Sequence, residues 1–156
     1  MAPATVHVKR EIMAEPEAVW RVITDLDRAS KVLTSIVKVE RLEGEGYDVG
    51  VKWRETRRMF GKEESEDMWV TEAVAPRSTT VAAQSRGTTY ATVFRCEPSS
   101  LGTTLHIDFS AETADAGVGQ RLAMAVFGKA GMKATEKALK QDLEDIAKAV
   151  EVTRRR

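Results

Sequence analysis

The sequence predicts an α+β fold with one antiparallel sheet of seven strands, two short N-terminal helices and a long C-terminal helix. Two observations predict this class. Between residues 36 and 113, runs of alternating polar and apolar residues follow one another with only short turn signals between them. Apolar residues at helical spacing occur before this region and again after it. Because the connections are short, sequential antiparallel pairing is the economical topology.

The N-terminal residues predict a strand followed at once by a helix. Apolar residues alternate with polar ones from Val6 to Ile12, which indicates a strand covered on one side. Pro16 stands near the first helical position, and an apolar stripe at helical spacing follows it. The stripe consists of Val19, Val22, Ile23 and Leu26. Residues 25–35 are expected to form a short second helix or an irregular segment.

Six further strands are expected before the last helix, and five turn signals separate them. They are residues 36–42, 49–59, 65–74, 79–85, 89–96 and 104–111. Glycine or proline occurs in every connection, which is typical of tight turns. The connections lie at residues 44–46, 61–62, 76–77, 86–87 and 98–102.

The C-terminal segment predicts a helix over residues 117–150, with Lys129 and Glu136 near its apolar stripe. The stripe consists of Val118, Leu122, Ala125, Met132, Leu139, Leu143, Ile146 and Val150. Gly128 and Gly131 interrupt it, and each glycine costs roughly 1 kcal/mol relative to alanine inside a helix. Three explanations are open: the helix bends there, it breaks into two helices, or the missing side chains leave room for a cavity beneath it.

Composition limits the classes of function. A single domain over residues 1–156 is the simplest organisation for a chain of this length. Lys plus Arg and Asp plus Glu both number 24, so no large field of one sign favours nucleic acid. The sequence has no apolar run long enough for stable membrane insertion, and its one cysteine, Cys96, excludes an intramolecular disulfide. We therefore expect a cytoplasmic protein with a structural thiol.

Three segments resemble a known superfamily. They are Val8-x-Arg10-x-Ile12-x-Ala14-x-Pro16-Glu17-x-Val19-Trp20, Val49-Gly50-Val51-x-Trp53-Arg54-Glu55-Thr56-Arg57 and Leu101-Gly102-Thr103-Thr104. With the order of expected elements, they resemble the START-like, or SRPBCC (Bet v 1-like), superfamily, and more narrowly its bacterial polyketide cyclase/dehydrase-like branch. The resemblance covers nearly the whole chain.

The resemblance implies a helix-grip fold, in which a curved sheet wraps around the long C-terminal helix and encloses an apolar cavity. Members of the superfamily bind lipids, sterols, polyketides, hormones or quinones, and only some are enzymes. Relatives often carry tryptophan and proline in the short second helix, whereas this chain has Arg28-Ala29-Ser30-Lys31-Val32-Leu33. The cavity entrance and the ligand are therefore expected to differ from those of such relatives.

The main candidate site residues are Trp53, Glu55 and Arg57. Period-two alternation places them on one face of a strand, and the cationic opposite face belongs in water, so the Trp53 face is the covered one. Glu55 and Arg57 form either a structural ion pair or the polar part of a ligand site, because burying both charges is costly. In an enzyme, Glu55 would act as general base and Arg57 would stabilise an enolate oxygen.

Four more residues are candidates for the lining of a cavity. Tyr90 and Phe94 share a strand face with Thr92, next to small residues of the preceding strand, although ordinary close packing gives the same pattern. Phe127 and Met132 flank the two glycines of the last helix. Tyr90 is the polar member of this group, because a buried phenol needs a hydrogen-bond partner.

Other chemistry lacks support in the sequence. His7 and His106 alternate against apolar neighbours, so each should lie on the outer face of the sheet. The resemblance implies that the first and last strands are neighbours, which would place the two histidines together. Two histidines without a third ligand make a poor metal site. No phosphate-binding loop or serine nucleophile motif occurs, so neither a cofactor nor a metal is expected.

Three functions remain open. The first is binding of a hydrophobic small molecule, such as a lipid, polyketide or isoprenoid, by a monomer or weak homodimer. The second is a polyketide cyclase or aromatase that uses Glu55, Arg57 and Tyr90. The third is a protein-interaction module whose cavity is filled by its own side chains.

Overall fold

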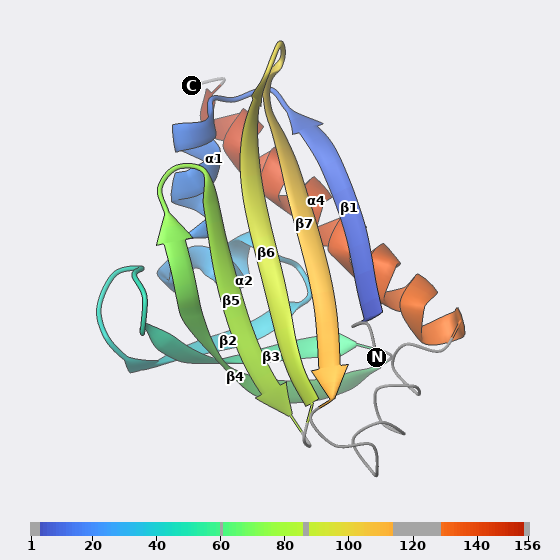
Figure 1. Ribbon diagram of the computed structural model, residues 1–156. Helices are drawn as coiled ribbons and strands as arrows, with labels where there is room; N and C mark the ends of the chain where they lie inside the picture. Colours follow the sequence, from blue (N-terminus) through green and yellow to red (C-terminus); the bar gives the residue numbers. More distant parts are fainter. Residues whose placement is uncertain (1–3, 60, 86–87, 114–128, 155–156) are drawn as a thin grey trace.

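A seven-stranded antiparallel sheet forms the body of the protein. The computed structural model describes residues 4–59, 61–85, 88–113 and 129–154. The strands are β1 (Ala4–Ile12), β2 (Ile36–Glu43), β3 (Lys52–Met59), β4 (Lys62–Val74), β5 (Ser78–Ser85), β6 (Thr88–Ser99) and β7 (Gly102–Thr113). Their order in the sheet is β1-β7-β6-β5-β4-β3-β2 (Figure 1). The predicted number of strands and the sequential antiparallel pairing are confirmed.

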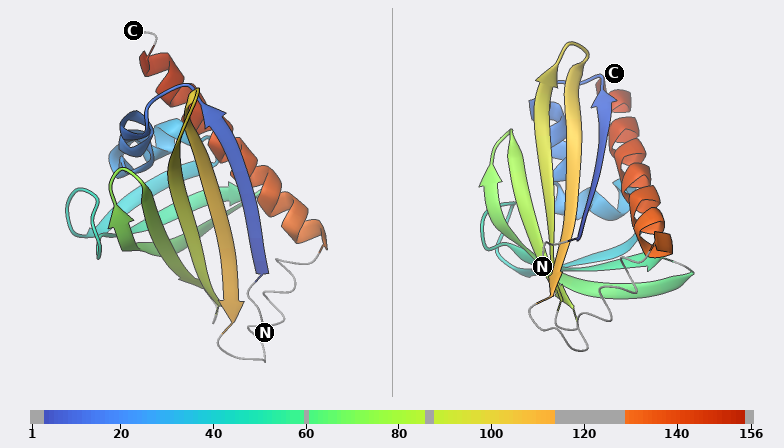
Figure 2. Two further views of the ribbon diagram at one scale, coloured as in Figure 1. Left: turned by 45° about the horizontal axis from the view of Figure 1, so that its top comes forward. Right: turned by 45° about the vertical axis from the view of Figure 1, so that its right-hand side comes forward.

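The helices lie on one side of this sheet. They are α1 (Pro16–Ile23), the 3-10 helix η1 (Leu26–Arg28), α2 (Ala29–Val32) and α4 (Lys129–Arg154). Strands β2 and β3 cross the direction of β5, β6 and β7, and β4 turns from the first direction to the second, so the sheet bends toward α4 (Figures 1 and 2). The helix-grip fold that the resemblance implied is therefore present. None of the helices that the structure describes has the length and apolar character needed to cross a membrane.

The predicted boundaries differ from the observed ones mainly at the turns. The strand expected from residue 49 begins at Lys52, because Gly50 has a φ of +94° and the Val51 amide donates to the Asp48 carbonyl at 3.0 Å in a turn. Strands β4, β6 and β7 reach further into their hairpins than expected. The pairing continues up to Met59 with Lys62 and up to Ser99 with Gly102.

The C-terminal helix is continuous from Lys129 through Gly131 to Arg154, past the predicted end at residue 150. The predicted helical positions Val118, Leu122, Ala125, Phe127 and Gly128 lie outside the described residues. Glu136 does not face the interior, because its side chain is 46% exposed and pairs with Lys140 at 3.1 Å along the helix. For Lys129 only the backbone is described.

Two core clusters fill the concave side. The first core cluster joins β1, β6, β7, α1 and α4 and consists of Val6, Val8, Ile12, Ala14, Val19, Cys96, Leu105, Ile107, Leu143, Ile146, Ala147 and Val150. The second core cluster lies mainly at β3, β4 and β5 and consists of Leu26, Val51, Trp53, Val70 and Val81. Between them lies the part of the interior that holds the candidate site.

Candidate functional site

Arg57 on β3 points to the concave side and joins this strand to α4. Its Nε donates to Glu55 Oε2 at 2.7 Å, and its Nη1 donates to Asp142 Oδ2 at 3.0 Å and to Ser35 Oγ at 2.8 Å. The side chains of Arg57, Glu55 and Asp142 are only 24%, 11% and 7% exposed. One guanidinium thus pairs with two partly buried carboxylates, one on β3 and one on α4.

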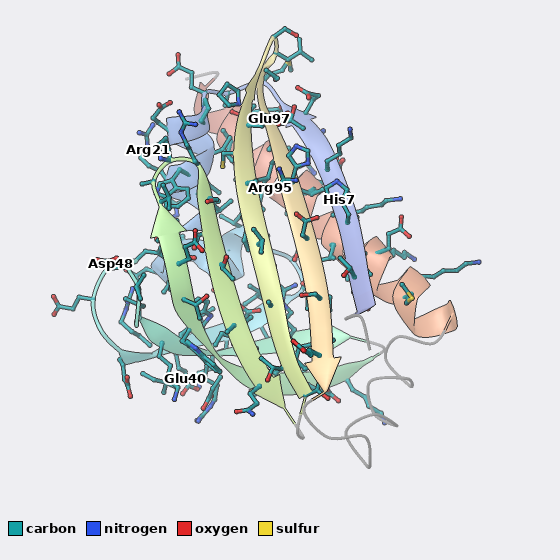
Figure 3. All side chains as sticks on the ribbon, in the orientation of Figure 1. His7, Arg21, Glu40, Asp48, Arg95 and Glu97 are labelled. Atoms are coloured by element: carbon teal, nitrogen blue, oxygen red, sulfur yellow. The ribbon has the colours of Figure 1, made fainter. Side chains whose placement is uncertain are left out.

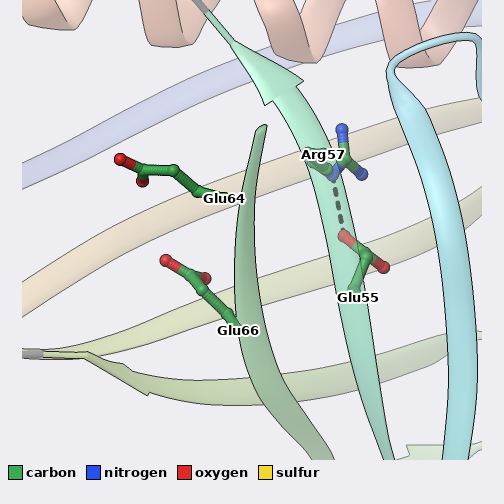
Figure 4. Close-up of a pocket in the computed structure, with 4 residues that line it drawn as sticks. All are labelled: Glu55, Arg57, Glu64 and Glu66. Atoms are coloured by element: carbon green, nitrogen blue, oxygen red, sulfur yellow. Dashed lines mark hydrogen bonds and ion pairs between the residues drawn. The ribbon is translucent and has the colours of Figure 1, made fainter. Parts of the chain in front are cut away.

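Two more carboxylates from β4 complete a small pocket around this ion pair. In the register of β3 and β4, Glu66 lies opposite Glu55 and Glu64 lies opposite Arg57. The four side chains line a cavity of about 80 Å³ (Figure 4). Among the described residues, no salt bridge neutralises either Glu64 or Glu66. The pocket therefore carries an excess of negative charge.

The electrostatics of the pocket follow from burial and from the crowding of carboxylates. Burial raises the pKa of Glu66, and the neighbouring charges of Glu55 and Glu64 raise it further, against the opposing effect of Arg57. Burial also raises the pKa of Asp142, although Arg57 lowers it in part. Burial disfavours the charge of Arg57, but the carboxylates of Asp142 and Glu55 outweigh that effect and raise the pKa of Arg57.

Trp53 lies on the same face of β3 but belongs to the second core cluster. It is 3% exposed, and its Nε1 donates to Glu55 Oε1 at 3.4 Å. Its ring lies 6.4 Å from the ring of Tyr47. Both oxygens of Glu55 therefore accept hydrogen bonds, one from Trp53 and one from Arg57.

The aromatic candidates lie on the concave face of β6 and β7. Tyr90 and Phe94 share this face with buried Cys96, and both are half-buried. Tyr90 stacks on Phe109 of β7, with ring centroids 5.7 Å apart and planes at 19°. Met132 packs against the first core cluster, and Phe127 lies outside the described residues.

Four polar residues of this region were missed from the sequence, namely Asp142, Glu64, Glu66 and Ser35. The sequence did contain a pattern that predicts the face of the two glutamates. Period-two alternation places Glu64 and Glu66 on the same strand face as the apolar residues Met68 and Val70. No sequence signal marked Ser35 or Asp142, because their link to Arg57 depends on how α2, β3 and α4 meet.

The two histidines lie together away from this site. Their rings stack with centroids 5.4 Å apart, and His7 Nδ1 lies 2.5 Å from Asp108 Oδ1. His7 and the nearby Arg95 and Glu97 are on the face of the sheet away from α4 (Figure 3). The prediction that the pair sits on the outer face is confirmed. Within the described ranges, no three His, Cys, Asp or Glu side chains converge in a way that could hold a metal ion.

Comparison with known proteins agrees with this class of fold. An aromatase/cyclase, ZhuI from Streptomyces sp. R1128, has a TM-score of 0.78 at 18% identity over 96% of this chain and 94% of its own. The protein TTHA0849 from Thermus thermophilus has a TM-score of 0.76 at 18% identity over 96% and 99%. A START superfamily protein from Mycobacterium smegmatis has a TM-score of 0.74 at 15% identity over 96% and 98%. No match was found among curated proteins.

The curved seven-stranded sheet and the long C-terminal helix define a protein of the helix-grip fold. At the level of sequence, a family model matches residues 3–151. The chain belongs to this family, which is described as polyketide cyclase / dehydrase and lipid transport.

Proposed function

We propose that this chain binds a hydrophobic small molecule of lipid, polyketide or isoprenoid type between the concave face of the sheet and α4. The observation that carries this proposal is a change in burial along the same two strands. Leu105 and Ile107 on β7 are 0% exposed, whereas Phe109, two residues further along the same face, is half-buried. Tyr90 and Phe94 on β6 are half-buried as well.

Half-buried aromatic side chains on a covered face favour a space that a ligand could fill. A closely packed interior buries such side chains almost completely, because voids in protein cores are small. Here the large residues alternate with small ones: Tyr90 lies between Ala83 and Ala111 in the register. An apolar wall with a few polar groups at one end is typical of small-molecule sites.

A substitution that fills this space tests the proposal. Thr92 lies on the concave face between Val81 and Phe109, and it is half-buried. We expect Thr92→Phe to reduce the affinity for Nile red, a neutral apolar dye, at least tenfold. The matched control is Thr89→Phe, on the exposed face of the same strand, which should leave the affinity unchanged.

A search for the natural ligand accompanies this test. Native and denaturing mass spectrometry of protein from its own cells should show an apolar compound in stoichiometric amount. If the protein neither carries such a compound nor binds Nile red, its interior is filled by its own side chains, and the proposal of ligand binding is wrong.

A proton-transfer enzyme of the cyclase/dehydrase type is the second candidate, and Glu66 is the observation that favours it. Glu55 is held by both Arg57 and Trp53, whereas Glu66 lines the same pocket with a raised pKa. A general acid or base needs this kind of environment. For this candidate, Glu66→Gln should abolish conversion of a bound polyketide chain while its binding persists. Conversion at the wild-type rate would exclude Glu66 from the chemistry.

A further inference from the structure

We propose that the pocket formed by Glu55, Arg57, Glu64 and Glu66 binds the protonated amine of an apolar ligand. This inference rests on the proposed function and specifies the class of ligand: a long-chain or polycyclic amine, as opposed to a fatty acid or a phosphorylated lipid. The four side chains, from β3 and β4, line one cavity (Figure 4). Charge, hydrogen bonding and size each support an ammonium group there.

The first argument is the balance of charge. Glu55, Glu64, Glu66 and Asp142 contribute four carboxyl groups, whereas the only cation that the structure places among these groups in the described ranges is Arg57. Arg57 is shared between Glu55 and Asp142, so the half-buried Glu66 and the exposed Glu64 have no counter-ion there among the described residues. An ammonium group between these two carboxylates would supply the missing charge and three N–H donors.

The same arrangement disfavours an anionic head group. A carboxylate or phosphate would have to displace Glu55 or Asp142 from Arg57, although these contacts are 2.7 Å and 3.0 Å long. It would also lie beside Glu66, whose pKa is already raised by burial and by neighbouring carboxylates. Like charges at such separations cost free energy even before a ligand enters.

A buried hydroxyl without a partner in the described part of the chain lies on the same concave face, two strands from β4 and outside the four side chains that line the pocket. Thr88 Oγ1 is fully buried, and among the described residues it has no hydrogen-bond partner. Thr88 shares the concave face of β6 with Tyr90, and in the pairing it lies opposite Ser85, at the end of the sheet where Glu66 lies. A buried polar atom without a partner is costly, so a ligand with a polar group that reaches Thr88 would remove that cost.

The size of the pocket fits a head group but not a whole ligand. A cavity of about 80 Å³ has room for a few water molecules or one ammonium group. The apolar tail would therefore continue along the concave face. Met68, two residues from Glu66 on the same face of β4, pairs with Ala83, which pairs with Tyr90. The polar pocket thus adjoins the half-buried apolar wall.

Three probes with the same tail separate head-group selection from binding of the tail. Dodecylamine, dodecanol and dodecanoate would each compete with Nile red at pH 7 and 150 mM salt, below their micelle-forming concentrations. We expect dodecylamine to bind at least tenfold more tightly than dodecanoate, with dodecanol between them. Because the chain has a formal net charge of zero, overall attraction of cations does not produce this order.

Two variants assign the preference to the pocket. The double variant Glu64→Gln with Glu66→Gln should bring the affinities of the amine and the acid within threefold of each other. The control Glu63→Gln removes a neighbouring, exposed carboxylate that pairs with Arg58 on the outer face, so the full preference should remain. Circular dichroism would verify that each variant is folded.

The outcomes distinguish this inference from the proposed function. Dodecanol binding with no preference for the amine, or with tighter binding of dodecanoate, would overturn the amine assignment and leave the apolar site standing. An amine preference that survives in the double variant would also overturn it. Failure of all three probes to bind would overturn the proposed function, and the amine site with it.

Discussion

At the scale of single residues, Arg57 is the most consequential side chain of the interior. It is the shared counter-ion of Glu55 and Asp142, which come from β3 and α4. Without Arg57, the carboxylates of Glu55 and Asp142 would lie close to each other and to Glu66. No other cation among the described side chains of the pocket would compensate their charge. Stability as well as ligand choice therefore depends on this one guanidinium.

Replacement of Arg57 should be strongly destabilising. We expect Arg57→Met to lower the free energy of unfolding by about 3 kcal/mol, the lower end for loss of one partner from a buried ion pair. The lower end applies because the Arg57 side chain is still 24% exposed. Urea unfolding at pH 7 measures the loss. Arg54→Met, on the opposite face of β3 with exposed Asp67 as partner, is the control, and an equal loss in both variants would contradict the argument.

Ionisation of Glu66 should lower the free energy of unfolding as pH rises, whereas ionisation of most carboxylates in folded proteins raises it. Its pKa is raised in the folded protein, so above the ordinary value of 4.5 the folded state holds the proton more tightly than the unfolded chain. The contribution of Glu66 to the free energy of unfolding is therefore lost as pH rises through its pKa in the folded protein. Glu66→Gln should unfold at a higher urea concentration than the wild type at pH 7, and the advantage should disappear below pH 4.5. A constant difference across this range would contradict the assignment.

The sequence predicted part of this site. Alternation on one strand was enough to place Glu55 and Arg57 on the same covered face, and their ion pair is present. Asp142 could not be predicted, because it is 85 residues from Arg57 and its contact depends on the path of α4 across the sheet. Alternation along β4 indicated the covered face for Glu66, but its position opposite Glu55 depended on the register of β3 and β4, which no local pattern predicts.

At the scale of elements, the β6–β7 hairpin meets the end of β1 at Gly102. Gly102 has a φ of +138°, and a Cβ atom there would lie 2.6 Å from the Ala14 carbonyl oxygen and 2.8 Å from the Ile12 carbonyl oxygen. The neighbouring Thr103 Oγ1 donates to the same Ala14 carbonyl at 2.7 Å. The hairpin thus holds the chain as it leaves β1 and before α1 begins.

Gly102→Ala should weaken this junction. We expect a loss of about 3 kcal/mol in the free energy of unfolding, the upper range for a strained backbone, because the added methyl group meets backbone atoms that cannot move aside. Gly46→Ala is the control, since its φ is +66° and no atom lies within 4 Å of the added methyl group. It should cost only about 1–2 kcal/mol for the left-handed backbone. Chemical denaturation of both variants measures the difference, and equal costs would show that the close approach to Ala14 is unimportant.

Helices and strands were predicted correctly where their signal lies in neighbouring residues of the sequence. Short turns with glycine or proline gave the number and pairing of the strands correctly. Boundaries failed at residues such as Val49 and Lys62, where side-chain alternation does not reveal whether the backbone has entered a turn. The bend of the sheet toward α4 came only from the resemblance to a family, because curvature arises from packing between elements.

At the scale of the whole molecule, Cys96 reports on the integrity of the first core cluster. It is 3% exposed, and burial raises the pKa of its thiol to about 11 from 9.0. Such a shift leaves about a hundredfold less thiolate at pH 8. Iodoacetamide should therefore label the folded protein at least a hundredfold more slowly than the protein in concentrated urea. Similar rates in the two conditions would mean that this part of the core opens readily.

The pairing of β1 with β7 has a consequence for folding during synthesis on the ribosome. His7 on β1 meets Asp108 on β7, 101 residues later in the chain. At a synthesis rate of about 5–20 residues per second, the first strand leaves the ribosome roughly 5–20 s before its only partner in the sheet has been made. During that interval the apolar face of β1 lacks its neighbours from β7 and α4. Completion of this sheet must therefore wait for its last strand, and we expect a nascent chain stalled before β7 to be prone to aggregation.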